Sequence, residues 1–258
     1  MTDQGEPALP SARRGSDEFP LPAPHPAQRA DWLASYDTFV RRTLALCRQP
    51  GAQQALRGGL AKPLSEIPTR THAALLRAGL VPDEARGDRR RAYYAVAALI
   101  AARSRGERRT DEHPEHAAGA DAAAAATETS APSVGGPVSY GTSLGESLAQ
   151  LSSRRLRQRS PSLEGPDQST QRDNESKVSG VEARLHLLVR QDTEGLHRML
   201  PAVARQLGSA SLVLDYGRLL ADVTRWAHAR DDIAVNWLQD YYRTLRRAPT
   251  RDVTPPGA

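Results

Sequence analysis

Apolar residues recur every three or four positions in each stretch of the chain that is rich in them. In residues 31–48, for example, Leu33, Tyr36, Val40 and Leu44 fall on one helical face, with polar residues between them. An α-helix gathers such positions into a single stripe because it has about 3.6 residues per turn. No stretch shows the strict alternation of a half-buried strand, so the pattern predicts an all-α fold.

The same spacing, together with glycine and proline breaks, predicts a series of helices. Their expected ranges are 31–48, 52–57, 69–78, 88–103, 143–153, 181–189 and 196–207. We expect Pro201 to split or restart the last of these, because proline has no backbone N–H. Two further helices are expected to begin near Asp215 and near Asp231 or Asp232, whose carboxylates can cap a helix N-terminus.

Low-complexity segments divide these helices into two small helical bundles joined by a flexible linker. The dividing segments are poor in apolar residues and rich in Pro, Gly, Ser, Ala or charge. The predicted division is a disordered leader over 1–27, an N-terminal helical block over 28–105, an acidic, alanine-rich linker over 106–141, a C-terminal helical block over 142–248 and a disordered tail over 249–258. We also expect a disordered insert at about 154–179 within the second block.

Composition narrows the class of protein. Hydrophobic residues make up 39% of the 258 residues, below the roughly 45–50% of an average globular domain. The single cysteine, Cys47, excludes an internal disulfide and a multi-cysteine zinc site, and it fits a reducing cytoplasm. The longest apolar run, 92–102, is too short to cross a bilayer, and the first residues lack the order of a secretory signal. We therefore expect a cytoplasmic protein with no membrane partner.

The charge of the chain is carried almost entirely by arginine. Of 35 basic residues all but two are arginines, and the formal net charge is +5. The positive charge is concentrated in residues 28–109, which hold sixteen basic and seven acidic residues. A guanidinium group can donate two parallel hydrogen bonds to phosphate oxygens, so this composition favours a polyanionic partner. A codon bias toward arginine would explain the same composition without one.

Two motifs could indicate enzyme chemistry, and both have simpler explanations. Residues 141–145 fit G-x-S-x-G, but the strand that must precede such a nucleophile elbow is not predicted. Ser143 and Glu146 instead fit a helix capping box. His113 and His116 are spaced H-x-x-H, with a proline between them and in a segment expected to be disordered. We therefore expect no catalytic residues, no cofactor and no metal.

The arginines offer better candidates for a binding site. Arg89, Arg90 and Arg91 lie at a predicted helix start, where backbone amides and guanidinium groups can converge on a phosphate. The alternative is a solvated charge run. Arg57 closes a short helix before two glycines, where it could cap carbonyls or contact a phosphate.

Arg184 falls on or beside an apolar stripe, and a buried arginine must be paired or bound. One explanation is a salt bridge, for example to Asp222 or Asp215. The other is that its guanidinium emerges into a groove that Arg190 and Arg205 also line.

The order of segments resembles the small subunit, CasB, of the type I-E CRISPR Cascade complex. The resemblance rests on Ala55-Leu56-Arg57, Tyr93-Tyr94 with the apolar run after it, Ser143-Leu144-Gly145, Glu182-x-Arg184-Leu185, Leu214-Asp215-Tyr216, Trp226 and Trp237-x-x-x-Tyr241-Tyr242. It covers roughly residues 30–104 and 140–243. The proline-rich leader and the two inserts depart from the compact family pattern.

The resemblance implies a non-catalytic, all-helical subunit of a crRNA-guided antiviral complex. The implied partners are crRNA and target DNA in the R-loop, the large and backbone subunits of Cascade, and a second copy of the chain. The nucleic-acid-binding residues it implies are Arg57, Arg89, Arg90, Arg91, Arg184, Arg190, Arg205 and Arg230. The alternative is a helical protein–protein adaptor without direct nucleic-acid contact, which would dock through aromatic residues such as Trp32, Tyr93 and Tyr242.

Overall fold

The computed structural model describes residues 31–103, 140–159 and 180–247, and these residues confirm the all-α class. The helices are η1 (Asp31–Leu33), α1 (Ala34–Leu46), α2 (Pro50–Arg57), η2 (Leu64–Glu66), α3 (Thr69–Arg77), α4 (Gly87–Ala102), α6 (Leu144–Arg159), a helix over 180–189, α8 (Thr193–Ser209) and α9 (Tyr216–Arg247). Within these ranges the β-type pairing is confined to an isolated bridge between Thr142 and Leu214.

Most helix boundaries follow the signals in the sequence. Asp215 caps α9 as expected, since its carboxylate accepts a hydrogen bond of 2.8 Å from the backbone N–H of Arg218. Asp192 does the same for α8 through the backbone N–H of Gly195, at 2.7 Å. Such caps satisfy backbone donors in the first turn that have no partner within the helix.

Two expectations about helix limits were wrong. Helix α8 continues through Pro201 instead of splitting there, because proline removes only one backbone donor and the packing of both halves retains the helix. Helix α6 continues to Arg159, six residues into the segment predicted to be an insert. The break expected near Asp231 is present: α9 consists of two helical halves joined by a kink at Ala229 (φ −130°, ψ 26°), two residues before Asp231.

The kink in α9 allows the two halves of the helix to share a core. Trp226 and Trp237, on either side of it, stack with ring centroids 5.0 Å apart. The indole N–H of Trp226 donates to the carbonyl of Gln191 at 3.1 Å, and that of Trp237 donates to the carboxylate of Asp222 at 2.8 Å. Both rings are thus fully buried with their polar atoms satisfied.

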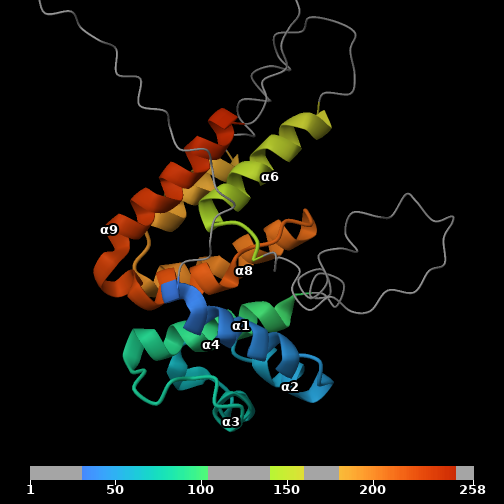
Figure 1. The fold of residues 1–258 in the computed structure, drawn as a ribbon, viewed down its shortest axis with the longest axis vertical. Helices are drawn as coiled ribbons and strands as arrows, with labels where there is room; N and C mark the ends of the chain where they lie inside the picture. The colour runs from blue at the N-terminus through green and yellow to red at the C-terminus, as the bar shows by residue number, and fades with distance from the viewer. Residues whose placement is uncertain (1–30, 104–139, 160–179, 248–258) are drawn as a thin grey trace, which may run out of the picture. The chain divides into compact units, whose positions relative to one another are not determined.

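Helix α4 lies at the centre of the packing, against α1, α2, α8 and α9 (Figure 1). Ten of its 16 residues are buried, as expected of a helix that is apolar on nearly every side. Its alanines allow the neighbouring helices to approach closely. Side chains from several elements therefore lie near each of its two ends.

One hydrophobic cluster includes buried residues from both predicted blocks, from Phe39 to Tyr241, and the described residues from Trp32 onward belong to one compact unit. The structure therefore does not confirm a division into two separate bundles. In the part of the chain that the structure describes, no helix is both long and apolar enough to cross a membrane.

Candidate nucleic-acid interface

Three arginines from different elements meet at the C-terminal end of α4. Arg57, the last residue of α2, donates a hydrogen bond of 3.1 Å to the carbonyl of Ala102. Arg103 follows directly in the chain, and Arg205 of α8 lines a hollow together with Ala102 and Arg103. We call Arg57, Arg103 and Arg205 the arginine cluster.

The hollow beside the arginine cluster has a volume of about 90 Å³. Buried leucines of three segments, among them Leu99, Leu207 and Leu214, contribute to its apolar lining. At its rim the guanidinium of Arg103 lies 5.3 Å from the ring centroid of Tyr216, a cation–π contact that orients it. Arg205 is exposed.

Two further arginines donate hydrogen bonds to residues at the C-terminal end of α8. The guanidinium of Arg184 donates to the side-chain oxygen of Gln206, the neighbour of Arg205, and Arg154 of α6 donates to the carbonyl of Ala210. The suggested salt bridge of Arg184 to Asp222 is not formed, since Asp222 instead pairs with Arg225 at 3.2 Å and accepts from Trp237. Arg190 is exposed just after the helix over 180–189.

Arg89, Arg90 and Arg91 lie at the other end of α4. Arg89 is 3.9 Å from the carboxylate of Glu84, and Arg90 donates to the carbonyl of Ala85 at 3.0 Å. Arg91 is buried, and its guanidinium donates to the carboxylate of Glu194 at 2.6 Å. This charged hydrogen bond holds the pKa of Glu194 below its usual value. Arg91 is therefore a bridge between α4 and α8 and does not reach the surface.

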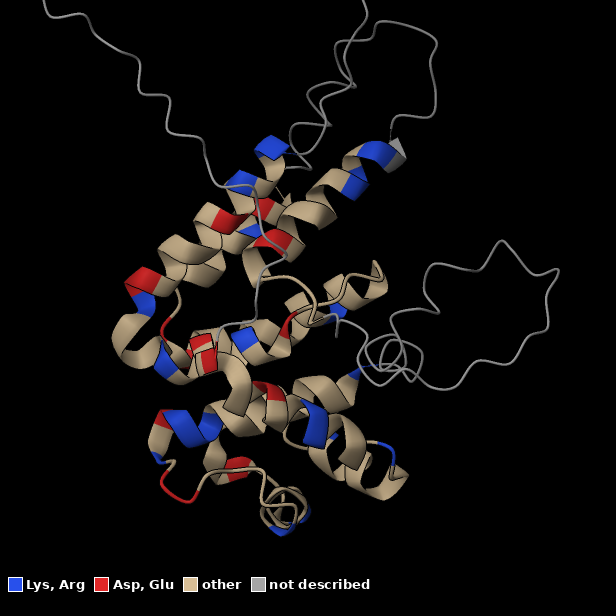
Figure 2. Ribbon diagram, in the orientation of Figure 1, with Lys and Arg blue, Asp and Glu red and all other residues tan. Residues whose placement is uncertain are grey.

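The two groups of arginines are well separated. Arg91 meets Glu194 at one end of the α4–α8 pair, and eleven residues further along each helix Ala102 meets Arg205. At a rise of about 1.5 Å per residue, eleven residues correspond to about 16 Å. The predicted residues therefore lie in two groups, and Figure 2 shows the cations distributed over several helices.

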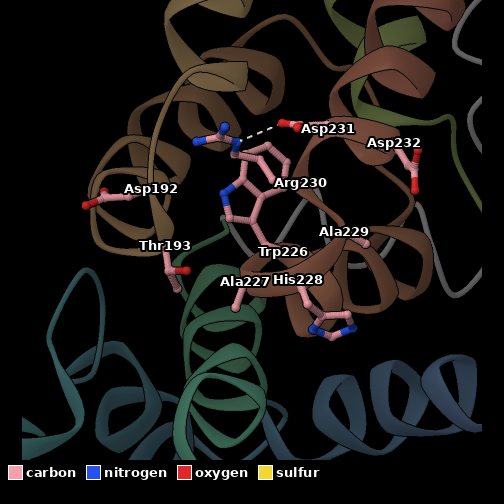
Figure 3. Close-up of a pocket in the computed structure, with 9 residues that line it drawn as sticks. All are labelled: Asp192, Thr193, Trp226, Ala227, His228, Ala229, Arg230, Asp231 and Asp232. Atoms are coloured by element: carbon pink, nitrogen blue, oxygen red, sulfur yellow. Dashed lines mark hydrogen bonds and ion pairs between the residues drawn. The ribbon is translucent and has the colours of Figure 1, made fainter.

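Arg230, like Arg91, lies near the start of α8. It lines a hollow of about 530 Å³ at the α9 kink, together with Asp192 and Thr193 at the start of α8. Its guanidinium is 3.1 Å from the carboxylate of Asp231, as Figure 3 shows. Asp192 and Asp232 also line this hollow, so Arg230 shares it with three carboxylates.

The hydrogen-bond acceptors differ in part between the two ends. Near the start of α4 and the α9 kink, Arg89, Arg91 and Arg230 are paired with carboxylates, although Arg90 donates to a neutral carbonyl. At the other end, among the described residues, the acceptors of Arg57, Arg154 and Arg184 are backbone carbonyls or an amide oxygen. A neutral acceptor satisfies some donors of a guanidinium without cancelling its charge. The acceptor of Arg57 therefore leaves the charge of this member of the arginine cluster intact.

Sequence reasoning missed Arg103 and Arg154 as members of this site. A cation just after a helix C-terminus complements the helix dipole, and this signal was available for Arg103. Arg154 lay in the segment predicted to be an insert, so its attachment to the end of α8 could not be inferred.

The G-x-S-x-G motif is a structural feature of the α6 start. The hydroxyl of Ser143 accepts a hydrogen bond of 3.3 Å from the backbone N–H of Glu146, as in the predicted capping box, and donates to the carboxylate of Asp240 at 2.6 Å. Ser143 is buried. His113 and His116 lie outside the described residues, and within these no cluster of three His, Cys, Asp or Glu side chains could hold a metal ion.

The described residues define an all-α, arginine-rich protein whose candidate site consists of guanidinium groups at helix ends. A family model for the CRISPR-associated protein Cse2 matches residues 53–242. The chain therefore belongs to the Cse2 family, which confirms its resemblance to CasB subunits of type I-E Cascade.

Solved structures agree with this assignment. A chain of a "CRISPR RNA-guided surveillance complex, pre-nicking" is 30% identical, with a TM-score of 0.57 over 83% of this chain and 96% of that one. A chain of a second CRISPR RNA-guided surveillance complex is also 30% identical, with a TM-score of 0.56 over 83% and 95%. CasB of M. ruber, at 22% identity and a TM-score of 0.51 over 83% and 95%, shares the fold. The comparison with curated proteins gave no match.

Proposed function

We propose that the chain is a non-catalytic subunit of a crRNA-guided surveillance complex that binds nucleic-acid backbone in the R-loop and stabilises the target and displaced strands. The observation that carries the proposal is the arginine cluster: Arg103 and Arg205 line one hollow together with Ala102, and Arg57 of α2 is bonded to the carbonyl of Ala102. Arg184 and Arg190 extend this site, whereas Arg91 is left out of it because it is buried and paired.

Stabilising an R-loop is a task that a surface of fixed arginines can perform. Guide–target pairing supplies sequence specificity, and the exchange of one duplex for another is nearly balanced in free energy. A few backbone contacts from a protein can then shift the equilibrium toward the open R-loop. This requires cations fixed on rigid helices, and it requires neither a reactive centre nor a base-reading element.

The family membership supports the partners that we propose. Two of the similar chains come from complexes described as CRISPR RNA-guided surveillance complexes. By analogy, this chain would contact crRNA and target DNA, the large and backbone subunits, and a second copy of itself.

Charge reversal at the arginine cluster tests the proposal. In the reconstituted complex, Arg57→Glu combined with Arg205→Glu should shorten the lifetime of the R-loop at least tenfold, because two attractive phosphate contacts become repulsive, each worth about 1 kcal/mol or more. The measurement is the dissociation rate of labelled displaced and target strands after a salt challenge. Arg89→Glu with Arg230→Glu is the matched control, since each of these arginines lies beside a carboxylate of its own.

An unchanged R-loop lifetime in a fully assembled complex would contradict the proposal. Loss of assembly, with normal strand binding by whatever complex forms, would favour the adaptor alternative. Of the aromatic residues considered for that alternative, Trp32 is exposed, Tyr93 is buried, and Tyr242 donates its hydroxyl to Glu182 at 2.6 Å.

A further inference from the structure

The hollow beside the arginine cluster combines an apolar lining with positive charge. Its floor is apolar and includes Leu99, Leu207 and Leu214, all buried. Its rim carries the guanidinium groups of Arg103 and Arg205, and Arg57 is bonded to the carbonyl of Ala102 in its wall.

A nucleotide has the complementary combination, because a flat, largely apolar base is joined to an anionic phosphate. A free phosphate would use the rim and leave the floor exposed to water, whereas an aliphatic side chain would use the floor and make no hydrogen bond to the guanidinium groups. We propose that this hollow takes the edge of an unstacked base from a single strand, while the flanking phosphates bind Arg57 and Arg205. The inference rests on the proposed function, and it specifies the ligand of the same site.

The size of the hollow indicates which base fits. A cavity that encloses a benzene ring has a volume of about 150 Å³, and this hollow has about 90 Å³. A base can therefore insert only one edge, and a single-ring pyrimidine fits better than a purine. The guanidinium of Arg103, oriented by Tyr216 at 5.3 Å, supplies a planar group on which the exposed part of the base can stack. A base held in a duplex cannot enter, so the site selects single strands.

Filling the hollow without changing any charge tests the inference. Ala204 lines it, so Ala204→Leu places a larger side chain in the space that the base would occupy. Ala202 is exposed on the same helix and is absent from the lining, so Ala202→Leu is the matched control. The probes are oligothymidylate and an abasic deoxyribose-phosphate strand of equal length and charge, with binding measured by fluorescence anisotropy on the full chain.

We expect Ala204→Leu to weaken binding of oligothymidylate by about fivefold or more and to leave binding of the abasic strand unchanged. The unchanged abasic binding would also show that the variant is folded. Equal effects of Ala202→Leu and Ala204→Leu on oligothymidylate, or none from either, would overturn base insertion and leave backbone binding intact. If the binding of neither strand depends on Arg57 and Arg205, the proposed function itself fails. This result differs from the failure of base insertion, in which binding of the abasic strand still depends on these arginines.

Discussion

His197 is a buried residue whose protonation the fold opposes. It is 3% exposed on α8, and neither ring nitrogen has a hydrogen-bond partner among the described residues. Burial, reinforced by the positive charge of Arg91, lowers the pKa of His197 from 6.5 to about 4. The histidine is therefore neutral in the folded protein under conditions in which it is charged in the unfolded chain.

This difference predicts a pH-dependent stability. Between pH 6.5 and about pH 4 the unfolded chain binds the proton more tightly, so the free energy of unfolding falls as the pH falls through that window. From pH 7 to pH 5 the loss from this one residue should be about 2 kcal/mol. Urea unfolding of the wild type and of His197→Leu at both pH values measures it. Between the two pH values, the free energy of unfolding of the variant should fall by about 2 kcal/mol less than that of the wild type. Identical decreases would contradict a lowered pKa of His197.

At the scale of single residues, the sequence predicted the role of several side chains but not their partners. Asp215 and Ser143 cap helices as their spacing indicated, because a cap depends only on residues three positions away. Arg91 was placed at a helix start without any indication that Glu194, more than a hundred residues later, would pair with it. Such long-range pairs depend on packing, which local spacing does not encode.

At the scale of elements, the position of α6 on α9 depends on a glycine. A Cβ atom built at Gly145 would lie 2.0 Å from the carbonyl oxygen of Trp237, so the backbones of the two helices approach too closely for any side chain. The hydrogen bond from Ser143 to Asp240 lies at the same crossing. Residues 141–145, which fit the sequence pattern of a nucleophile elbow, therefore contribute to helix packing.

We predict that Gly145→Ala destabilises the protein by about 3 kcal/mol or more, because overpacking at rigid backbone forces the helices apart. Chemical denaturation measures the change. Gly51 of α2 is the matched control, since nothing lies within 4 Å of a Cβ atom at that position. Gly51→Ala should be neutral or slightly stabilising, and a similar loss in both variants would rule out the close approach as the cause.

The limits of helices were harder to predict than their existence. Apolar spacing placed every long helix that the structure describes, and the acidic pair after Ala229 located the kink, whereas the effect of Pro201 was misjudged. In both places tertiary contacts contribute to the outcome. The packing of α8 outweighs the lost donor of Pro201, and the stacking of Trp226 on Trp237 accompanies a bend that the sequence suggested as a break.

At the scale of the whole molecule, the sequence named eight arginines as one set of nucleic-acid-binding residues, and the structure places them in two groups. Composition shows how many cations a segment has, but the carboxylates that pair with them can come from elsewhere in the chain. Glu194 pairs with Arg91 and Asp231 with Arg230. In the arginine cluster, Arg57 donates to a neutral carbonyl, which leaves its charge intact.

This asymmetry predicts different salt dependences for two variants that lose the same formal charge. Each phosphate contact with a single strand contributes about −0.7 to the slope of log K against log salt concentration. Arg57→Gln with Arg205→Gln should therefore reduce the magnitude of the slope by about 1.4, because two counterion-releasing contacts are lost. Arg89→Gln with Arg230→Gln should reduce it by less, since each of these guanidinium groups lies beside a carboxylate of its own, Glu84 and Asp231. Equal reductions in a salt titration of oligothymidylate binding would mean that net charge, and not the cluster, attracts the strand.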